Sequence, residues 1–284
     1  MKKEGRRRPH RLRDSVEDSL RAGTIPDTAQ SRSSTYRLAF TDRDFLLREE
    51  LRPVRLQLEL LKPQMALDEA GITSTVVMFG SARIPAPEQA RVARNPGLAA
   101  LSHHYAEAQK LAEALTRRSL QTGGTTDVVC TGGGPGIMEA GNRGAAAAGG
   151  HSIGLNIVLP HEQVPNPYVT PELCFNFHYF AMRKMHFLMR AKAICIFPGG
   201  FGTLDEMFES LTLIQSGRME KVPFLLFGRA FWEGLINWQA LVDAGTIAPG
   251  DLDLFRYVED ADEAFAIIES FRNGSSAAGE SAPG

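Results

Sequence analysis

The sequence predicts an α/β fold in which a parallel sheet carries helices on both faces, preceded by an N-terminal helical extension. From Ile72 onward, short apolar runs alternate with longer amphipathic segments, which is typical of parallel strands joined by crossover helices. The chain has 284 residues, 43% of them hydrophobic and 8% aromatic, so it can build a sizeable core. Glycine clusters follow two of the apolar runs, where a strand would turn sharply into a helix.

Composition divides the chain into four segments. They are a disordered basic and polar tail (1–40), an accessory helical segment (41–71), the α/β domain (72–272) and a disordered polar tail (273–284). The first segment is rich in Arg, Ser and Thr and poor in apolar residues, which predicts disorder. In the second, Asp42 or Asp44 can cap a helix, and Pro53 and Pro63 are expected to interrupt it.

The alternation places six strands and six helices in the α/β domain. The strands are expected at Thr75–Phe79, Asp127–Cys130, Ser152–Ile157, Ala193–Phe197, Pro223–Phe227 and Leu254–Val258. The helices are expected at Leu98–Ser119, Gly136–Ala148, Tyr179–Ala191, Thr203–Gln215, Ala230–Ala244 and Ala261–Phe271. Ligands of such sheets bind at the carboxyl ends of the strands, so functional residues should directly follow the apolar runs.

Two glycine clusters stand at such strand ends. The first follows Cys130 and reads Thr131-Gly132-Gly133-Gly134-Pro135-Gly136-Ile137-Met138-Glu139. The second follows Phe197 and reads Pro198-Gly199-Gly200-Phe201-Gly202-Thr203-Leu204-Asp205-Glu206. Glycines let the backbone approach a ligand closely, and the helix that follows offers free N–H groups and a partial positive charge. Each loop is therefore a candidate anion cradle, with a tight turn that binds nothing as the alternative.

The glycine spacing excludes the common nucleotide-binding loops. GxGxxG fails at Ile137 in the first cluster and at Asp205 in the second, and the chain has no GxxxxGK[ST]. We therefore expect the anion to be a monophosphate on a small molecule.

Two further segments hold candidate site residues whose roles the spacing leaves open. The Thr203 hydroxyl can cap the following helix and also contact a phosphate. Glu206 is either the acid of a Thr-x-x-Glu capping box or a catalytic carboxylate. Arg183 lies on the helix before the second glycine strand, but spacing alone does not show that it meets Glu206. Lys184 belongs either to a solvated charged helix face or to the same site.

The motifs GGGPGIMEA, MRKMHF and PGGFGTLDE, with the turn Phe79–Arg83, together resemble the LOG (Lonely guy) family of phosphoribohydrolases. Many bacterial members of that family have been labelled lysine decarboxylases. The resemblance covers residues 72–271 and implies a modified Rossmann fold. It also implies hydrolysis of the N-glycosidic bond of nucleoside 5′-monophosphates, which releases the free base and ribose 5-phosphate. AMP and, in some members, cytokinin nucleotides are the implied substrates, and no metal or organic cofactor is implied.

The family's functional residues carry over position by position. Arg183 and Glu206 match the catalytic pair. The substrate-binding positions are matched by Gly199, Gly200, Gly202 and Thr203 in the phosphate loop, by Gly132, Gly133, Gly134, Gly136, Met138 and Glu139 in the other turn, and by Ser81 and Lys184. The segment before residue 72 is absent from the shortest members, so the resemblance does not fix substrate choice or assembly. Asp205 stands where many members have Glu.

Charge and cysteine content argue against several classes of protein. The net charge is −2, but residues 1–13 hold seven basic residues and one acid, which leaves 24 basic and 32 acidic residues elsewhere. This acidic body argues against a nucleic-acid surface. The three cysteines form no CxxC pair, which indicates a reducing cytoplasm and argues against structural zinc. The basic head precedes no apolar stretch, so we expect neither a secretory signal nor a membrane span.

Two other functions compete with hydrolysis. Lysine decarboxylation normally needs pyridoxal phosphate on a Schiff-base lysine, and no lysine stands in such a setting. A non-catalytic nucleotide or cofactor binder of the same fold, such as a molybdenum-cofactor carrier, would keep the glycine loops but would not need Glu206. The resemblance also implies a homo-oligomer, without fixing the number of subunits or the preferred base.

Overall fold

A computed structural model describes residues 14–92, 95–160 and 164–279, with side chains up to residue 274. Contacts divide the chain into two units, residues 1–58 and 59–284, each of which is described by itself. Of the predicted disordered tails, residues 1–13 and 280–284 lie outside the described residues.

The first unit contains short helices and buries none of the apolar side chains described in it. Its elements are α1 (Ser15–Ala22), α2 (Arg43–Leu46), the start of α3 (Arg52–Glu69), and the 3₁₀ turns Ser34–Tyr36 and Glu49–Leu51. Helix α1 falls in the stretch for which disorder was predicted, and Asp14 caps it by accepting from the Val16 N–H at 2.8 Å. Asp42 caps α2, as the sequence suggested.

The second unit is built on a seven-stranded sheet in which every neighbouring pair is parallel. The strands are β1 (Thr75–Phe79), β2 (Val128–Thr131), β3 (Ser152–Ile157), β4 (Cys174–Phe177), β5 (Ala191–Ile196), β6 (Phe224–Phe227) and β7 (Arg256–Val258). Their order is β4-β3-β2-β1-β5-β6-β7, so the predicted α/β class with a parallel sheet is confirmed. Strand β4 was not predicted.

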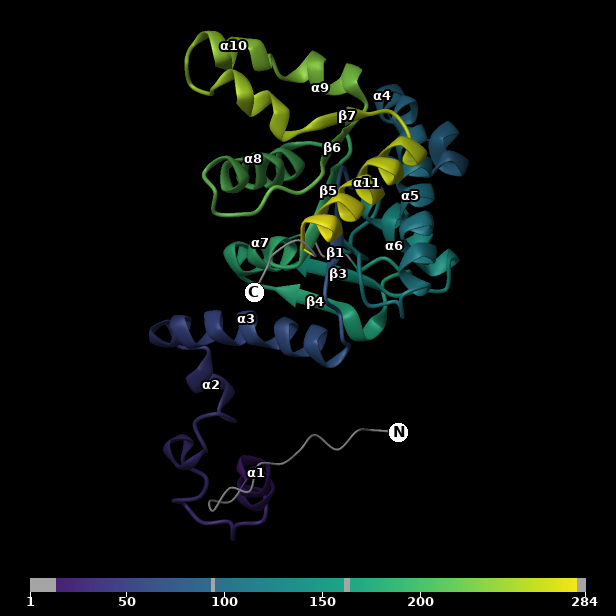
Figure 1. Cartoon of the computed structure of the whole chain (residues 1–284). Helices are drawn as coiled ribbons and strands as arrows, with labels where there is room; N and C mark the ends of the chain where they lie inside the picture. The colour runs from purple at the N-terminus through teal and green to yellow at the C-terminus, as the bar shows by residue number, and fades with distance from the viewer. Residues whose placement is uncertain (1–13, 93–94, 161–163, 280–284) are drawn as a thin grey trace. The chain divides into compact units, whose positions relative to one another are not determined.

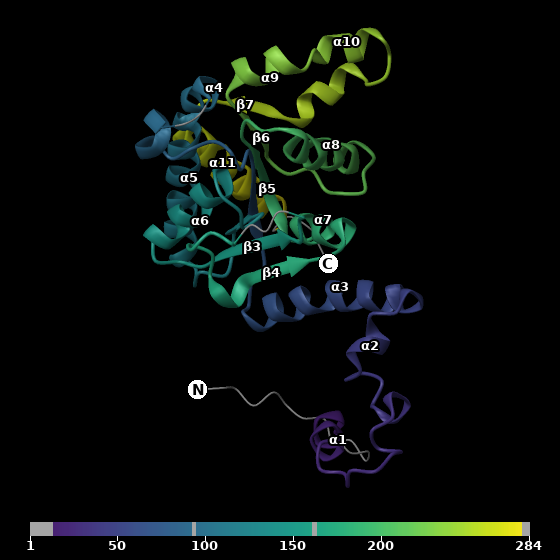
Figure 2. The ribbon, with the colours of Figure 1, turned by 180° about the vertical axis from the view of Figure 1, so that it is seen from behind.

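Helices cover both faces of this sheet, as predicted (Figures 1 and 2). In the second unit they are α4 (Pro96–Ala100), α5 (Ser102–Leu120), α6 (Ile137–Ala147), α7 (Phe180–Leu188), α8 (Phe201–Gln215), α9 (Arg229–Leu235), α10 (Trp238–Asp243) and α11 (Ala261–Gly279). One core joins α5, α6 and α11 to strand residues such as Val76 and Cys195. The other joins α7, α8 and α9 to alternate strand residues such as Val77 and Ile194. None of the described helices combines the length and apolar character needed to cross a membrane.

Several helices depart from the bounds that the sequence predicted. The predicted helix over Leu98–Ser119 is two helices, α4 and α5, separated at Leu101. Helix α3 continues through Pro63, where a break was expected. The predicted helix over Ala230–Ala244 is two helices, because the side chain of Asn237 accepts from the Ala240 N–H and starts a new one. Helix α11 runs to Gly279, past the expected end at Phe271 and into the predicted C-terminal tail.

The strand order creates the place for a site. The chain passes from β1 outward to β4 and then returns to β5 on the other side of β1. Ligands of open α/β sheets bind at such a reversal, outside the carboxyl ends of the strands. The segments that directly follow β1, β2 and β5 therefore meet at one end of the sheet.

Candidate active site

A cavity of about 840 Å³ opens at the carboxyl ends of β1, β2 and β5. Of the predicted site residues, it is lined by Ser81, Gly132, Gly134, Met138, Arg183, Gly199, Gly200, Gly202, Thr203 and Glu206. Both glycine loops and both members of the predicted catalytic pair thus border one space. Gly133, Gly136, Glu139 and Lys184 do not line it.

Ser81 joins the two glycine loops through its backbone. Its N–H donates to the Pro198 carbonyl at 3.0 Å, and its carbonyl accepts from the Ile137 N–H at 3.1 Å. The close approach requires glycine at two places. A Cβ on Gly80 would lie 2.7 Å from Ile137, and one on Gly136, whose φ is +68°, would overlap the Ser81 carbonyl. Gly136 therefore shapes the loop from behind the cavity.

The first glycine loop is held from behind by buried amide side chains that sequence reasoning missed. Asn166 Nδ2 donates to the carbonyls of Gly133 and Gly134 at 3.1 and 2.9 Å, and to Asn142 Oδ1 at 2.9 Å. Thr131 Oγ1 accepts from the Gly133 N–H and donates to Asn142 Oδ1. These hydrogen bonds satisfy the buried carbonyls of Gly133 and Gly134 and support the conformation of the loop.

The second glycine loop leads directly into α8. The helix begins at Phe201 with Gly200 as its N-cap, and the N–H groups of Thr203 and Leu204 both donate to the Gly200 carbonyl at 3.0 Å. Thr203 is therefore the third residue inside the helix, and no side chain in the described part of the chain caps this end. The capping box considered for Thr203 and Glu206 is absent. The N-terminus of α8 stays available to an anion.

Glu206 is a buried carboxyl without a full set of partners. The residue is 5% exposed, and its Oε2 has no hydrogen-bond partner among the described residues. Burial raises the pKa of Glu206 to about 7, against the opposing charges of Lys184 and Arg183. Carboxyls with a pKa near neutral in a cleft are typical of catalytic acids and bases.

Arg183 lines the cavity and lies against the first glycine loop at Gly132. Its Nε donates to the Leu155 carbonyl at 2.7 Å, and its guanidinium stands 5.1 Å from the centre of the Phe187 ring. A Cβ on Gly132 would come within 2.7 Å of an Arg183 Nη atom, so a larger residue there would displace the guanidinium. Burial lowers the pKa of Arg183, while the charge of Glu206 raises it.

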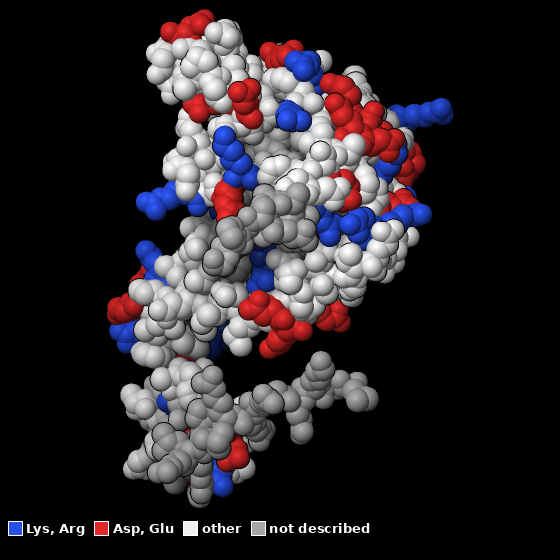
Figure 3. Space-filling model, in the orientation of Figure 1, with Lys and Arg blue, Asp and Glu red and all other residues white. Residues whose placement is uncertain are grey.

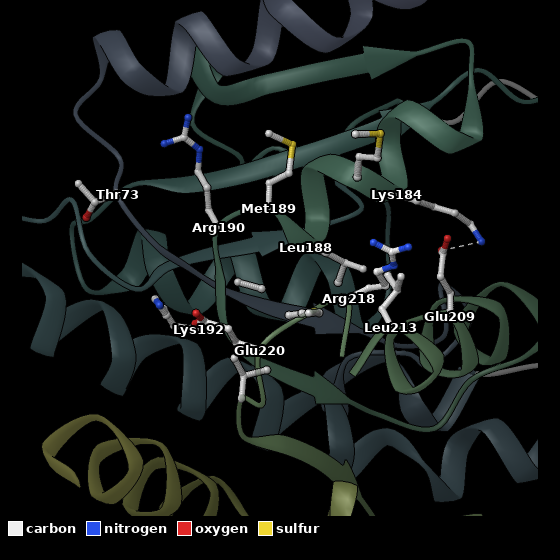
Figure 4. A pocket seen from close by; sticks show the side chains of 14 residues that line it. Thr73, Lys184, Leu188, Met189, Arg190, Lys192, Glu209, Leu213, Arg218 and Glu220 are labelled. Carbon is white, nitrogen blue, oxygen red and sulfur yellow. Dashed lines mark ion pairs between the residues drawn. The ribbon is translucent and has the colours of Figure 1, made fainter. Parts of the chain in front are cut away.

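Two predicted ligands have partners elsewhere. Glu139 Oε1 accepts from the buried Tyr105 hydroxyl at 2.8 Å. Lys184 Nζ pairs with Asp205 Oδ2 at 2.8 Å and with Glu209 Oε2 at 2.9 Å. Lys184 and Glu209 line a separate hollow, which reaches the start of β5 and is shown with their ion pair in Figure 4.

The cavity also has an apolar wall that the motifs did not reveal. Its members are Phe79, Ile157, Leu159, Phe180, Phe187, Phe201, Leu204, Phe231 and Leu235. Phe201 stands inside the second motif, and its 92% exposure distinguishes it from a core aromatic. Phe231 and Leu235 of α9 could not be predicted as lining residues, because nothing in their local sequence links them to a nucleotide. The fold brings them to the cavity. Among the described residues, the lining contains no lysine and the chain no metal-binding group of three ligands.

The chain is similar to proteins of one enzyme family. A family model described as "Possible lysine decarboxylase" matches residues 138–268, which include α7 and the second glycine loop. A rice (Oryza sativa subsp. japonica) protein named "Probable cytokinin riboside 5'-monophosphate phosphoribohydrolase LOGL5" is 29% identical over 126 residues, 43% of this chain. The match spans half of that relative's length.

Two further proteins are similar over a longer stretch. The cytokinin riboside 5'-monophosphate phosphoribohydrolase LOG5 of Arabidopsis thaliana is 26% identical over 168 residues, which is 58% of this chain and 70% of the relative. The solved Moco carrier protein of Chlamydomonas reinhardtii is 17% identical, with a TM-score of 0.46, over 71% of this chain and 99% of its own.

Proposed function

We propose that this protein hydrolyses the N-glycosidic bond of nucleoside 5′-monophosphates. Its motifs, the matching family model and the similar proteins relate it to the LOG phosphoribohydrolases. The products are the free base and ribose 5-phosphate. One observation carries the proposal: the buried carboxyl of Glu206, unpaired at Oε2, shares a cavity with Arg183 and two glycine loops. The expected cytoplasmic location and homo-oligomer remain predictions.

In this proposal, the phosphate binds where the second glycine loop becomes α8. The first-turn N–H groups and the Thr203 hydroxyl supply donors, and the helix dipole favours the negative charge. Anchoring the phosphate positions C1′ beside Glu206, so that binding energy from a non-reacting group lowers the barrier. The base then lies along the apolar wall, whose aromatic rings suit a purine.

The bond between C1′ and the base breaks with its electron pair leaving on the base. The base nitrogen takes up a proton, and water adds to C1′ and loses a proton. Ionised Glu206 stabilises the positive ribose ring or accepts the proton from water, and either role requires the carboxylate. Arg183 orients the substrate and balances the charge that develops as the base departs.

A binding protein without catalysis is the alternative function. A carrier would hold a phosphate at the same glycine loops, but it would gain nothing from an unpaired carboxyl buried at Glu206, because burying that group has a cost. The family description as a decarboxylase has less support, since no lysine is among the described lining residues that would bind pyridoxal phosphate covalently.

The test is release of ribose 5-phosphate from AMP, followed by other nucleoside monophosphates that include N6-isopentenyl AMP. We expect turnover by the wild type and a loss of kcat of about 10²-fold or more in Glu206→Gln, with the Kd for AMP unchanged because the phosphate loop is intact. Arg183→Ala should also lose turnover. Glu113→Gln, a change on the outer helix α5, is the matched control. Binding of AMP without release, at high enzyme concentration, would instead support the carrier.

A further inference from the structure

Lys184 connects the two helices that carry the proposed catalytic pair. It follows Arg183 on α7, and its ammonium group pairs with Asp205 and Glu209 of α8 at 2.8 and 2.9 Å. Its side chain is only 16% exposed, so the two ion pairs are shielded from solvent on one side. Figure 4 shows the pair with Glu209 beside the hollow that both residues line.

The two partners of Lys184 flank Glu206 along α8. Asp205 precedes Glu206 by one residue, and Glu209 follows it by three, which places them one helical turn apart. Three carboxyls so close on one helix would repel one another if all were ionised. Only Glu206 of the three lines the cavity, and it has no ion pair of its own in the described structure.

We propose that Lys184 is a positioning residue that neutralises Asp205 and Glu209, so that Glu206 ionises in the pH range of catalysis. This inference rests on the proposed function, because it assigns Lys184 to the ionisation of the catalytic carboxyl and not to the substrate. Through these two ion pairs Lys184 also links α7 to α8, the helices that carry Arg183 and Glu206.

The charges that face Glu206 come from these two helices. Arg183 and Lys184 of α7 favour its carboxylate, while Glu209 and Asp205 of α8 favour the protonated form. Burial raises the pKa of Glu206, and among the charges that lower it Lys184 has the largest effect. Burial also disfavours the charge on Lys184, but its two carboxylate partners outweigh this and raise its pKa, so the ammonium stays charged.

The deciding experiment is the pH dependence of kcat/KM for Lys184→Met. Losing the cation leaves two uncompensated carboxylates beside Glu206, so we expect the acid limb to move alkaline by about one pH unit, with activity recovering at high pH. Lys184→Arg should keep the wild-type limb. The matched control is Lys110→Met, which removes a lysine that bridges α5 to Asp262 of α11, far along the sequence from the site. If Lys184→Met raises KM for AMP and leaves the limb in place, Lys184 binds substrate and the proposal fails.

A second variant separates the proposed charge effect from misfolding. Asp205→Asn removes one repelling carboxylate and leaves Lys184 paired with Glu209, so the acid limb should move to lower pH. General damage to the helix pair would not produce this opposite shift, and an unchanged or alkaline limb would overturn the proposal.

The ionisation of Glu206 can also be measured without turnover. In protein labelled with ¹³C at glutamate carboxyls, the Glu206 signal is identified by its absence from Glu206→Gln, and its titration midpoint should rise in Lys184→Met. A midpoint that does not move contradicts the inference whether or not AMP is cleaved. A midpoint that rises in a protein that never releases ribose 5-phosphate supports the charge coupling and removes the proposed hydrolysis.

Discussion

At the scale of single residues, the site combines a catalytic advantage with a cost in stability. Glu206 is buried, and its pKa of about 7 lies above its ordinary value of 4.5. The folded protein therefore holds this proton more tightly than the unfolded chain does. Glu206 contributes favourably to stability below about pH 4.5, and that contribution is lost as the pH rises through 7.

This loss of stability with rising pH leads to a prediction for the stability of Glu206→Gln. Above pH 7 the wild type must keep an ionised carboxyl in a buried place, whereas the amide stays neutral, so the variant should be more stable at pH 8 by about 2 kcal/mol. The difference should close near pH 5, where Glu206 is protonated in the fold. Thermal unfolding at both pH values, with Glu113→Gln as the control, measures this. A variant no more stable than the wild type at pH 8 would contradict the buried ionisation.

The sequence could identify these residues but not their environment. Arg183, Glu206 and the glycine loops follow from motif and family resemblance, because those signals are local. Whether Thr203 caps a helix depends on where α8 begins, and the helix begins two residues earlier than predicted. The partners of Lys184 and Glu139 come from other helices, so no spacing along the chain could have revealed them.

At the scale of elements, the position of α7 depends on the end of α3 that belongs to the second unit. Pro63 has no N–H, so the Glu59 carbonyl one turn earlier has no helical donor. It is contacted instead by His186 Nε2 of α7 at 3.2 Å. The Glu59 carboxylate accepts from the N–H groups of His178 and Tyr179 at 2.8 and 3.0 Å, which holds the backbone directly before α7. The proline expected to break a helix therefore helps to attach the one that carries Arg183.

Removing the Glu59 carboxylate tests whether α3 positions α7. Glu59→Ala takes this acceptor from the N–H groups of His178 and Tyr179 and should cost about 1–2 kcal/mol of stability. Because Arg183 lies in the first turn of that helix, kcat/KM for AMP should fall several-fold as well. Calorimetry and the ribose 5-phosphate assay are the two readouts, and Glu69→Ala on the same helix is the control. Unchanged melting and turnover would show that α7 is held by its packing alone.

Strand β4 shows which elements are hard to predict. It has four residues, Cys174–Phe177, and its exposure alternates because it lies at the edge of the sheet. Four residues with an asparagine among them give too short a pattern to separate a strand from a loop. Strands such as β1 and β6 could be predicted because buried parallel strands are covered on both faces and leave a continuous apolar run.

At the scale of the whole molecule, charge is distributed without one dominant basic surface on the face shown in Figure 3. Lys and Arg side chains are scattered there among acidic ones. The cations that a nucleotide would meet are local instead, namely Arg183 and Arg83 in the cavity lining, together with the start of α8. A short-range arrangement of this kind does not need an overall positive charge.

The basic residues 1–13 should therefore be dispensable for the proposed reaction. A chain that starts at residue 14 loses seven basic residues and one acid, which changes its net charge from −2 to −8. At 0.15 M salt, charges more than about 8 Å apart are largely screened, so this change should alter neither kcat nor KM for AMP by more than about twofold. At this salt concentration the change should be visible only in tighter binding to an anion exchanger.

Repeating the assay at 0.01 M salt separates long-range charge repulsion from a role in catalysis. There the truncated chain should show a higher KM with the same kcat, because the longer-range repulsion of a dianion is no longer screened. A large fall in kcat at either salt concentration would mean that residues 1–13 take part in catalysis or in the assembly of the site.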